Sequence, residues 1–179
     1  MGHLDTQYNT PGAHDNAASL VVVVMLAHAF SGATHPKTLT FIGTTAEEYD
    51  YLGIKHYVAK RKAERSLGRV KFVLNFDSLT YGFNHHVYSK SVELRELYRK
   101  AHGETKSATA PEYFDQDPGN DARFFAQEGI PSVEFNSRGD NERTLPLWHH
   151  PDDTAETINS DFVESSFVVL REFLARLTG

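Results

Sequence analysis

The sequence predicts an α/β fold, a three-layer sandwich in which helices flank a mostly parallel central sheet. Segments typical of strands and of helices alternate along the whole chain, which is the pattern of α/β proteins. Residues 70–76 (VKFVLNF) are largely apolar, as a strand buried inside a parallel sheet is. Asp77 follows this segment directly, and α/β folds gather their functional groups at the carboxyl ends of strands.

Three further segments predict strands. Residues 37–45 (KTLTFIGTT) are rich in β-branched and apolar side chains and follow Pro36. Residues 132–136 and the shorter segment 86–89 have a similar composition and lie between segments with helical patterns. Together with residues 70–76 they supply the strands of the predicted sheet.

Five segments predict helices. Residues 15–29 begin with Asp15 and Asn16, which favour helix caps, and end near Gly32. Residues 50–65 form the second segment, which ends at Gly68. The remaining three segments are residues 92–102, 120–128 and 161–177, the last with Asn159 or Ser160 as its N-cap. Because no repeat or low-complexity linker interrupts this order, we expect a single domain, residues 1–179.

Composition excludes several classes of function. The formal net charge is −6 and no cluster of Lys and Arg offers the cationic surface that phosphate contacts require, so a nucleic-acid partner is not expected. The longest apolar run, residues 20–26, is far shorter than the roughly 20 residues of a membrane span. Because the chain has no cysteine, any metal ion must be held by histidine and carboxylate groups. Peptides or small molecules are the expected partners.

Histidines and carboxylates gather beside predicted strand ends and turns. These residues are His3 with Asp5, Asp15, the pair Glu47 and Glu48, Asp77, and His149 with Asp153. Imidazole and carboxylate groups suit zinc and similar divalent cations, and two neighbouring ions need one carboxylate to bridge them. Asp15 is the candidate for this bridge. Of Glu47 and Glu48, one can bind metal while the other acts as a base.

Five motifs occur in an order and spacing that resemble a known family. They are GHLDT (2–6), TPGAHDNAAS (10–19), TTAEEYDYLG (44–53), NFDS (75–78) and HHPDDT (149–154). The chain resembles the di-zinc aminopeptidases of the bacterial secreted leucine aminopeptidase type, which are related to glutamate carboxypeptidase and glutaminyl cyclase. The resemblance covers essentially the whole chain. It implies a zinc-exopeptidase-like fold and an aminopeptidase that hydrolyses peptides or aminoacyl small molecules.

The resemblance also implies a set of metal ligands. Asp15 bridges two zinc ions. His3 and Asp77 complete one site, and Glu48 and His149 complete the other. Manganese or cobalt also suits these ligands.

Catalysis and ligand orientation are assigned by the same resemblance. Glu47 is the general base, which takes a proton from a water activated by the two zinc ions. Asp5 accepts a hydrogen bond from His3 and so fixes the orientation of that ring. Asp153 does similar work near His149, whose distance from Asp153 in the sequence favours it over His150 as the ligand.

The amino terminus departs from the family pattern. Members of the family have a helical and β-hairpin segment before the H-x-D strand, and this chain lacks it. Its absence would expose a sheet edge, which favours a homo-oligomer. The chain has no leader and fits the cytoplasm as written, whereas a longer parent with a signal would be exported, so localisation stays open. Residues 135–143, which precede the metal histidine, are expected to form a pocket loop.

Two alternative functions are retained. The first is a glutaminyl-cyclase-like acyltransferase with a single zinc ion, against which the presence of both His3 and Asp77 argues. The second is a non-catalytic domain derived from the same fold. The presence of Glu47 and of all five ligands argues against this second alternative.

Overall fold

The central sheet brings together segments that are far apart in the sequence. The computed structural model describes residues 1–32, 34–138 and 147–179. Its strands are β1 (Gly2–His3), β2 (Gly43–Thr44), β3 (Val73–Phe76), β4 (Asn84–Tyr88), β5 (Glu112–Phe114) and β6 (Ser132–Arg138). The pairs β1–β2, β3–β6 and β4–β5 are parallel, and β4–β6 is antiparallel. Met1 joins the pair β1–β2 to β3, because its amino group donates to Leu74 O (2.7 Å) and its carbonyl accepts from Phe76 N (2.9 Å).

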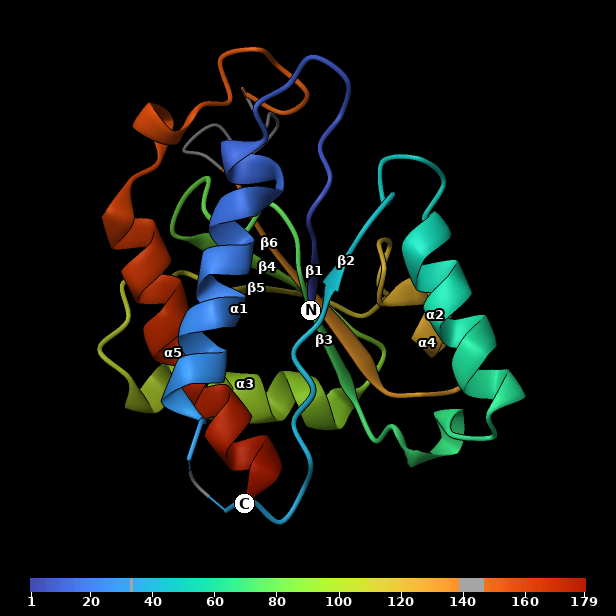
Figure 1. Ribbon diagram of the computed structural model, residues 1–179. Helices are drawn as coiled ribbons and strands as arrows, with labels where there is room; N and C mark the ends of the chain where they lie inside the picture. The colour runs from blue at the N-terminus through green and yellow to red at the C-terminus, as the bar shows by residue number, and fades with distance from the viewer. Residues whose placement is uncertain (33, 139–146) are drawn as a thin grey trace.

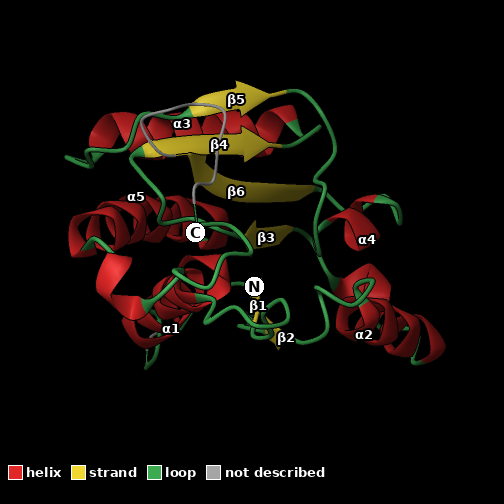
Figure 2. Ribbon diagram, turned by 90° about the horizontal axis from the view of Figure 1, so that it is seen from above, coloured by secondary structure: helices red, strands yellow, loops and turns green. Residues whose placement is uncertain are grey.

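Helices cover both faces of this sheet, as predicted. They are α1 (Ala18–Ala29), α2 (Leu52–Ala63), α3 (Val92–Glu104), α4 (Arg123–Ala126) and α5 (Ser160–Thr178). Helices α1, α3 and α5 pack on one face, and α2 and α4 lie on the other (Figures 1 and 2). The three-layer sandwich with a mostly parallel sheet is therefore confirmed. Among the described residues, no helix is both long and apolar enough to cross a membrane.

Each face of the sheet has its own apolar core. On β6, the alternate residues Val133 and Phe135 both point into the larger core, beneath α1, α3 and α5. On β3, Val73 and Phe76 point to opposite faces, because three positions separate them. The smaller core beneath α2 and α4 is built from Met1, Ile54, Val58, Leu67, Val73, Ala122, Phe125 and Ile130. Two buried cores hold the strand ends in fixed positions.

Several predicted element boundaries are wrong. Of residues 37–45, only Gly43 and Thr44 form a strand, because their partner strand β1 has only two residues. Of residues 120–128, only Arg123–Ala126 are α-helical. Helix α2 ends at Ala63, so Gly68 does not terminate it and lies instead in a 3₁₀ turn, Leu67–Arg69. The sequence pattern did not indicate β5.

The start of α1 also differs from the prediction. The backbone of Asp15 and Asn16 is not helical, and the α-helix begins at Ala18. The Asn16 side chain does not cap this helix, because its amide donates to Phe76 O (3.0 Å) and accepts from Ser78 N (3.1 Å). These contacts tie the segment before α1 to the end of β3. At the other end of the chain, Asn159 is the N-cap of α5, and its side chain accepts from Asp161 N (2.9 Å).

A buried histidine in the larger core predicts a loss of stability in acid. His85 on β4 is fully buried between Tyr98 Oη and Ser166 Oγ, each 2.8 Å from a ring nitrogen. Burial, reinforced by His102 and His86, lowers the pKa of His85 from 6.5 to about 3. The unfolded chain therefore binds one more proton at pH 5, so the stabilisation is complete above pH 6.5 and falls between that pH and about 3.

We expect the His85→Gln variant to depend less on pH than the parent chain. Between pH 7 and pH 5 the parent should lose about 2 kcal/mol more free energy of unfolding than the variant, since one pKa unit corresponds to about 1.4 kcal/mol. Urea unfolding at the two pH values measures the free energy of unfolding of the parent and of the variant. Equal losses in the two proteins would show that His85 is not responsible.

Candidate metal centre

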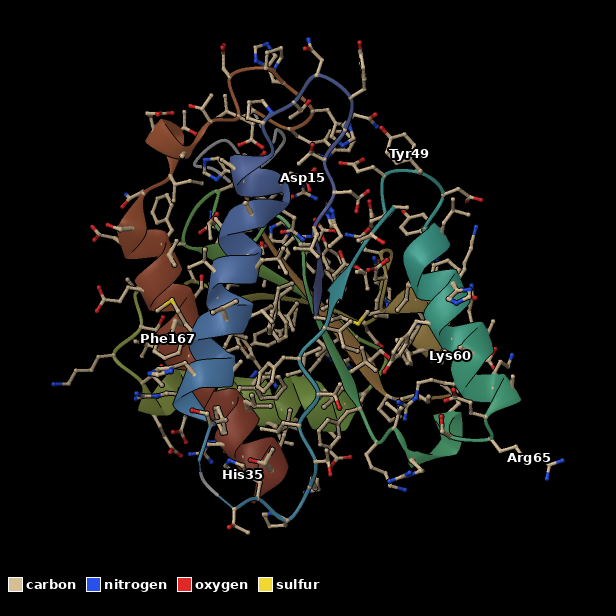
Figure 3. The ribbon with its side chains drawn as sticks, in the orientation of Figure 1. Asp15, His35, Tyr49, Lys60, Arg65 and Phe167 are labelled. Carbon is tan, nitrogen blue, oxygen red and sulfur yellow. The ribbon has the colours of Figure 1, made fainter. Side chains whose placement is uncertain are left out.

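The five predicted ligands lie together at one end of the sheet. His3 ends β1, Glu48 follows β2, and Asp77 follows β3. Asp15 lies before α1, and His149 lies in a turn ahead of α5. Figure 3 shows Asp15 at the end of the molecule where the β2–α2 loop carries Tyr49, with His35 at the opposite end. The parallel strands bring these residues together because their carboxyl ends share one edge.

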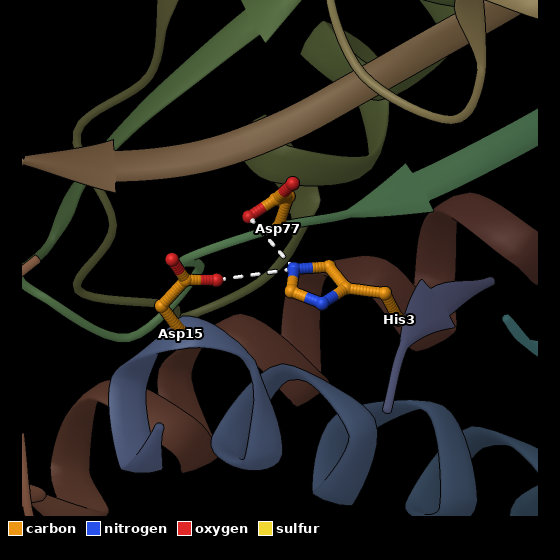
Figure 4. Close-up of side chains that lie close together, drawn as sticks. All are labelled: His3, Asp15 and Asp77. Carbon is orange, nitrogen blue, oxygen red and sulfur yellow. Dashed lines mark ion pairs between the residues drawn. The ribbon is translucent and has the colours of Figure 1, made fainter. Parts of the chain in front are cut away.

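Two groups of side chains could each hold a cation, and Asp15 belongs to both. The first group is His3, Asp15 and Asp77, and the second is Asp15, Glu48 and His149. In the first, His3 Nε2 lies 3.0 Å from Asp15 Oδ1 and 3.7 Å from Asp77 Oδ1 (Figure 4). In the second, His149 Nε2 lies 3.5 Å from Asp15 Oδ2 and 3.1 Å from Glu48 Oε2. Each oxygen of Asp15 therefore faces a different group.

The spacing and burial of these atoms fit divalent cations. Two ligand atoms bound to one tetrahedral zinc ion at about 2.0–2.1 Å lie about 3.4 Å apart. The separations of 3.0 to 3.7 Å bracket this value. Within the described part of the chain, Oε1 of Glu48 is buried and accepts no hydrogen bond. Buried oxygens without donors are the acceptors that a metal ion satisfies.

The pKa shifts of the clustered side chains also favour bound cations. Burial lowers the pKa of His3, but the carboxylates of Asp15 and Asp77 outweigh this effect and raise it to about 12. Burial raises the pKa of Asp15, and the charge of Asp77 adds to the rise while His3 opposes it. Burial and the nearby Asp15 raise the pKa of Glu48. Carboxylates buried this close to one another are stabilised in their charged form by cations placed among them.

Glu47 lies beside the ligands but outside both groups. It lines a cavity of about 840 Å³ whose wall also includes all five predicted ligands. Burial raises the pKa of Glu47 to about 8, and the charge of Asp77 adds to the effect. The two neighbouring carboxylates therefore differ in their surroundings. Both line the cavity, but Glu48 belongs to the second ligand group, whereas Glu47 belongs to neither group.

Asp5 holds the segment that carries Glu47 and Glu48. Its Oδ1 accepts from Glu47 N and its Oδ2 accepts from Glu48 N, each at 3.1 Å. The predicted contact with His3 needs a correction. His3 Nδ1 lies 2.9 Å from the backbone carbonyl oxygen of Asp5 and 3.7 Å from its carboxylate. The carboxylate instead accepts from two backbone amides in the loop after β2.

Asp153 also contacts a partner that differs from the predicted one. Its carboxylate accepts from His14 N (2.8 Å) and Asp15 N (3.2 Å), so it holds Asp15 in place of the predicted contact with His149. Gly12 permits this turn, since a Cβ atom at its φ of +72° would lie 2.0 Å from Thr6 Cγ2. Of the two adjacent histidines, His149 joins the ligand group, and His150 is exposed beside Asp152 (3.4 Å).

Sequence reasoning assigned no role to Asn120 or Glu134, which support the wall of the cavity. Asn120 donates from Nδ2 to Asp77 Oδ2 (2.5 Å), and Glu134 accepts from the backbone of Gly119 and Asn120. A signal was available for Glu134, since an ionisable residue in the buried strand β6 requires hydrogen-bond partners. Arg138 ends β6 and lines the cavity. Of the expected pocket loop, residues 135–138 are strand and residues 139–143 lie outside the described residues.

Comparison with known proteins assigns the chain to a family. A model of that family, described as Peptidase family M28, matches residues 1–174. The chain belongs to peptidase family M28. Among curated proteins, this M28 chain is 26% identical over 172 residues to aminopeptidase YwaD of Bacillus subtilis, covering 92% of the chain and 37% of YwaD. It is 25% identical over 144 residues to the probable leucine aminopeptidase 2 of Aspergillus oryzae, covering 73% of the chain and 28% of that protein.

A solved structure shares the fold of this chain. The zinc aminopeptidase BSAP of Bacillus subtilis superposes with a TM-score of 0.87 and 24% sequence identity, over 98% of this chain and 44% of that one. At this identity the likeness shows the fold. The chain spans less than half the length of each of these three relatives.

Proposed function

We propose that this M28 chain carries the catalytic site of an aminopeptidase that uses two zinc ions, with Glu47 as the general base. The observation that carries the proposal is the placement of Asp15 between two groups of ligands. Its Oδ1 faces His3 and Asp77, and its Oδ2 faces Glu48 and His149. A carboxylate with one oxygen in each of two adjacent ligand groups is the arrangement that bridges a pair of ions.

The donor set favours zinc. Each group combines one imidazole with two carboxylates, and the chain has no cysteine. The superposed relative BSAP is described as a zinc aminopeptidase, which supports zinc and not manganese or cobalt. When bound, the ion pair supplies Lewis acidity that lowers the pKa of water and polarises a peptide carbonyl.

The protein contributes proton transfer and substrate placement. Asp5 holds the amides of Glu47 and Glu48, so that Glu48 reaches the ligands and the Glu47 carboxylate stays in the cavity. Glu47 takes the proton from the attacking water and delivers it to the leaving amine, which completes hydrolysis without a separate acid. Asp5 acts through Glu47 and is a positioning residue. The role predicted for it in catalysis is indirect in this proposal.

The cavity suits a short peptide or an aminoacyl compound. Its volume of about 840 Å³ is in the range of small-molecule sites. Tyr51, Tyr88 and Trp148 line it together with the polar residues of the cluster. Aromatic side chains in a polar cavity offer apolar contact area for a substrate side chain.

The proposal is tested by measuring zinc per chain and cleavage of a panel of aminoacyl chromogenic substrates on protein purified without chelators. We expect about two zinc ions and cleavage that a chelator abolishes and added zinc restores. A single ion with cyclisation of an amino-terminal glutamine would favour the glutaminyl-cyclase-like alternative. Two bound ions without cleavage of any aminoacyl or peptide substrate would overturn the assignment as an aminopeptidase.

A further inference from the structure

Three carboxylates near the cavity share one type of contact. Asp5 accepts from the consecutive amides of Glu47 and Glu48, and Asp153 accepts from those of His14 and Asp15. In each of these pairs, one amide belongs to a candidate metal ligand. Glu134 makes the same contact with a third pair, because its Oε2 accepts from Gly119 N (2.7 Å) and Asn120 N (3.1 Å).

The third pair of amides, those of Gly119 and Asn120, is connected to the candidate ligand Asp77 by the Asn120 side chain. The Asn120 side chain donates from Nδ2 to Asp77 Oδ2 at 2.5 Å. The other oxygen of Asp77, Oδ1, lies 3.7 Å from His3 Nε2 in the first ligand group. Asn120 therefore holds Oδ2 of Asp77, while Oδ1, which also accepts from Ser78 Oγ (3.2 Å), faces His3 in the first ligand group.

Glu134 is buried and, among the described residues, its oxygens accept from neutral amide groups. It is 4% exposed. Burial and the charge of Asp77 raise its pKa, and the backbone amides of Gly119 and Asn120 oppose that rise. Its second oxygen, Oε1, accepts from Asn136 Nδ2 at 3.3 Å. A buried carboxylate is costly to maintain unless such donors compensate it, which indicates a specific role in ordering the Gly119–Asn120 segment.

We propose that Glu134 is a positioning residue for the ion held by His3, Asp15 and Asp77, acting through the Gly119–Asn120 backbone and the Asn120 side chain. This inference rests on the proposed function. It predicts an effect on one ion only, because the hydrogen bonds of the described residues do not connect Glu134 to Glu48 or His149. Removal of hydrogen-bonding partners behind metal ligands lowers metal affinity by about 10- to 100-fold.

The decisive measurement is the affinity of each ion in the Glu134→Met variant, which keeps the length of the side chain and removes both acceptors. Zinc titration calorimetry with a competing chelator resolves the ions, and the visible absorption of bound cobalt reports their ligand geometry. We expect one ion to bind at least about tenfold more weakly while the other keeps its parental affinity. Glu134→Gln, which retains one acceptor oxygen, should lose less affinity for the same ion, and it provides the test if the Met variant does not fold.

Two further variants separate positioning from general destabilisation. Ser89→Ala removes a buried hydroxyl that accepts from Ser91 N (3.1 Å) and donates to Ser132 O (2.7 Å), in a segment without ligands. It should lower thermal stability without changing the affinity for either ion. Asn120→Ala should weaken the same ion as Glu134→Met, and the double variant should be little worse than Asn120→Ala alone, since both residues act through one path.

The outcomes separate this inference from the proposed function. Fewer than two ions on the parent protein would overturn both proposals. If the parent protein binds two ions and the Glu134→Met variant binds both with the parental affinities, only the role of Glu134 would be overturned. Equal weakening of both ions, or fully additive effects of the Glu134 and Asn120 substitutions, would also overturn it.

Discussion

Glu47→Gln is expected to lower kcat for aminoacyl substrates by about 10³-fold while leaving the zinc content near that of the parent chain. The amide keeps the shape of the side chain but cannot accept a proton, and general base catalysis contributes about 10²- to 10⁴-fold. Metal binding should persist because Glu47 belongs to neither ligand group. Steady-state kinetics and elemental analysis of the same preparation measure the two quantities together.

Two other Glu→Gln variants serve as controls for Glu47→Gln, one at the adjacent residue and one away from the ligands. Glu48→Gln changes the adjacent carboxylate, and we expect it to lose an ion as well as activity, because Glu48 lies in the second ligand group. Glu128→Gln alters a carboxylate that pairs with Lys62 (2.6 Å), far from the ligands, and it should retain parental activity. Parental kcat in the Glu47→Gln variant would exclude Glu47 as the base.

Asp15→Asn is expected to weaken both ions together and to abolish hydrolysis. Each oxygen of Asp15 faces one ligand group, and an amide offers a single neutral oxygen in place of two charged ones. Zinc content after dialysis should therefore fall from about two ions per chain to below about one. Elemental analysis and zinc titration measure the change.

Single-site variants test whether Asp15 acts as a bridge. His3→Ala and His149→Ala each remove a ligand from one group, so each should weaken one ion and leave the other. An Asp15→Asn protein that keeps one ion at parental affinity would show that Asp15 serves a single site. Circular dichroism of each variant establishes that the fold is retained.

Local sequence patterns predicted the long elements better than the short ones. The predicted helices 92–102 and 161–177 correspond to Val92–Glu104 and Ser160–Thr178, because an amphipathic period over many residues is a strong signal. The strand predicted at 37–45 is reduced to Gly43–Thr44, since its length depends on the partner strand. β5 has three residues and is placed by pairing with β4, which no local pattern reveals.

In the candidate site, local motifs predicted the residues but not their distant hydrogen-bond partners. The five predicted ligands and Glu47 were named from motifs that resemble those of a known family, and the structure brings all six residues to one cavity. The predicted hydrogen bond from His3 to Asp5 forms with the backbone carbonyl of Asp5, so the two amides that its carboxylate holds were not predicted. The partner of Asp153 was predicted incorrectly, and no partner was predicted for Glu134. Asp153 and the amide that it holds at Asp15 are 138 positions apart, and Asp5 is 43 positions from the amide of Glu48.

The sequence by itself determined the family, the layered α/β architecture and the identity of the residues gathered at the site. The family and the site residues follow from the resemblance of five short motifs to a known family, and the architecture follows from the alternation of strand and helix patterns; all of these are local properties of the chain. Only the tertiary structure decided which oxygen of Asp15 faces which ligands, that Asp5 and Asp153 hold backbone amides, and that Glu134 is linked to Asp77. Hydrogen bonds require a donor and an acceptor within about 3 Å, and for segments distant in the sequence this proximity is set by packing of the sheet and its two cores.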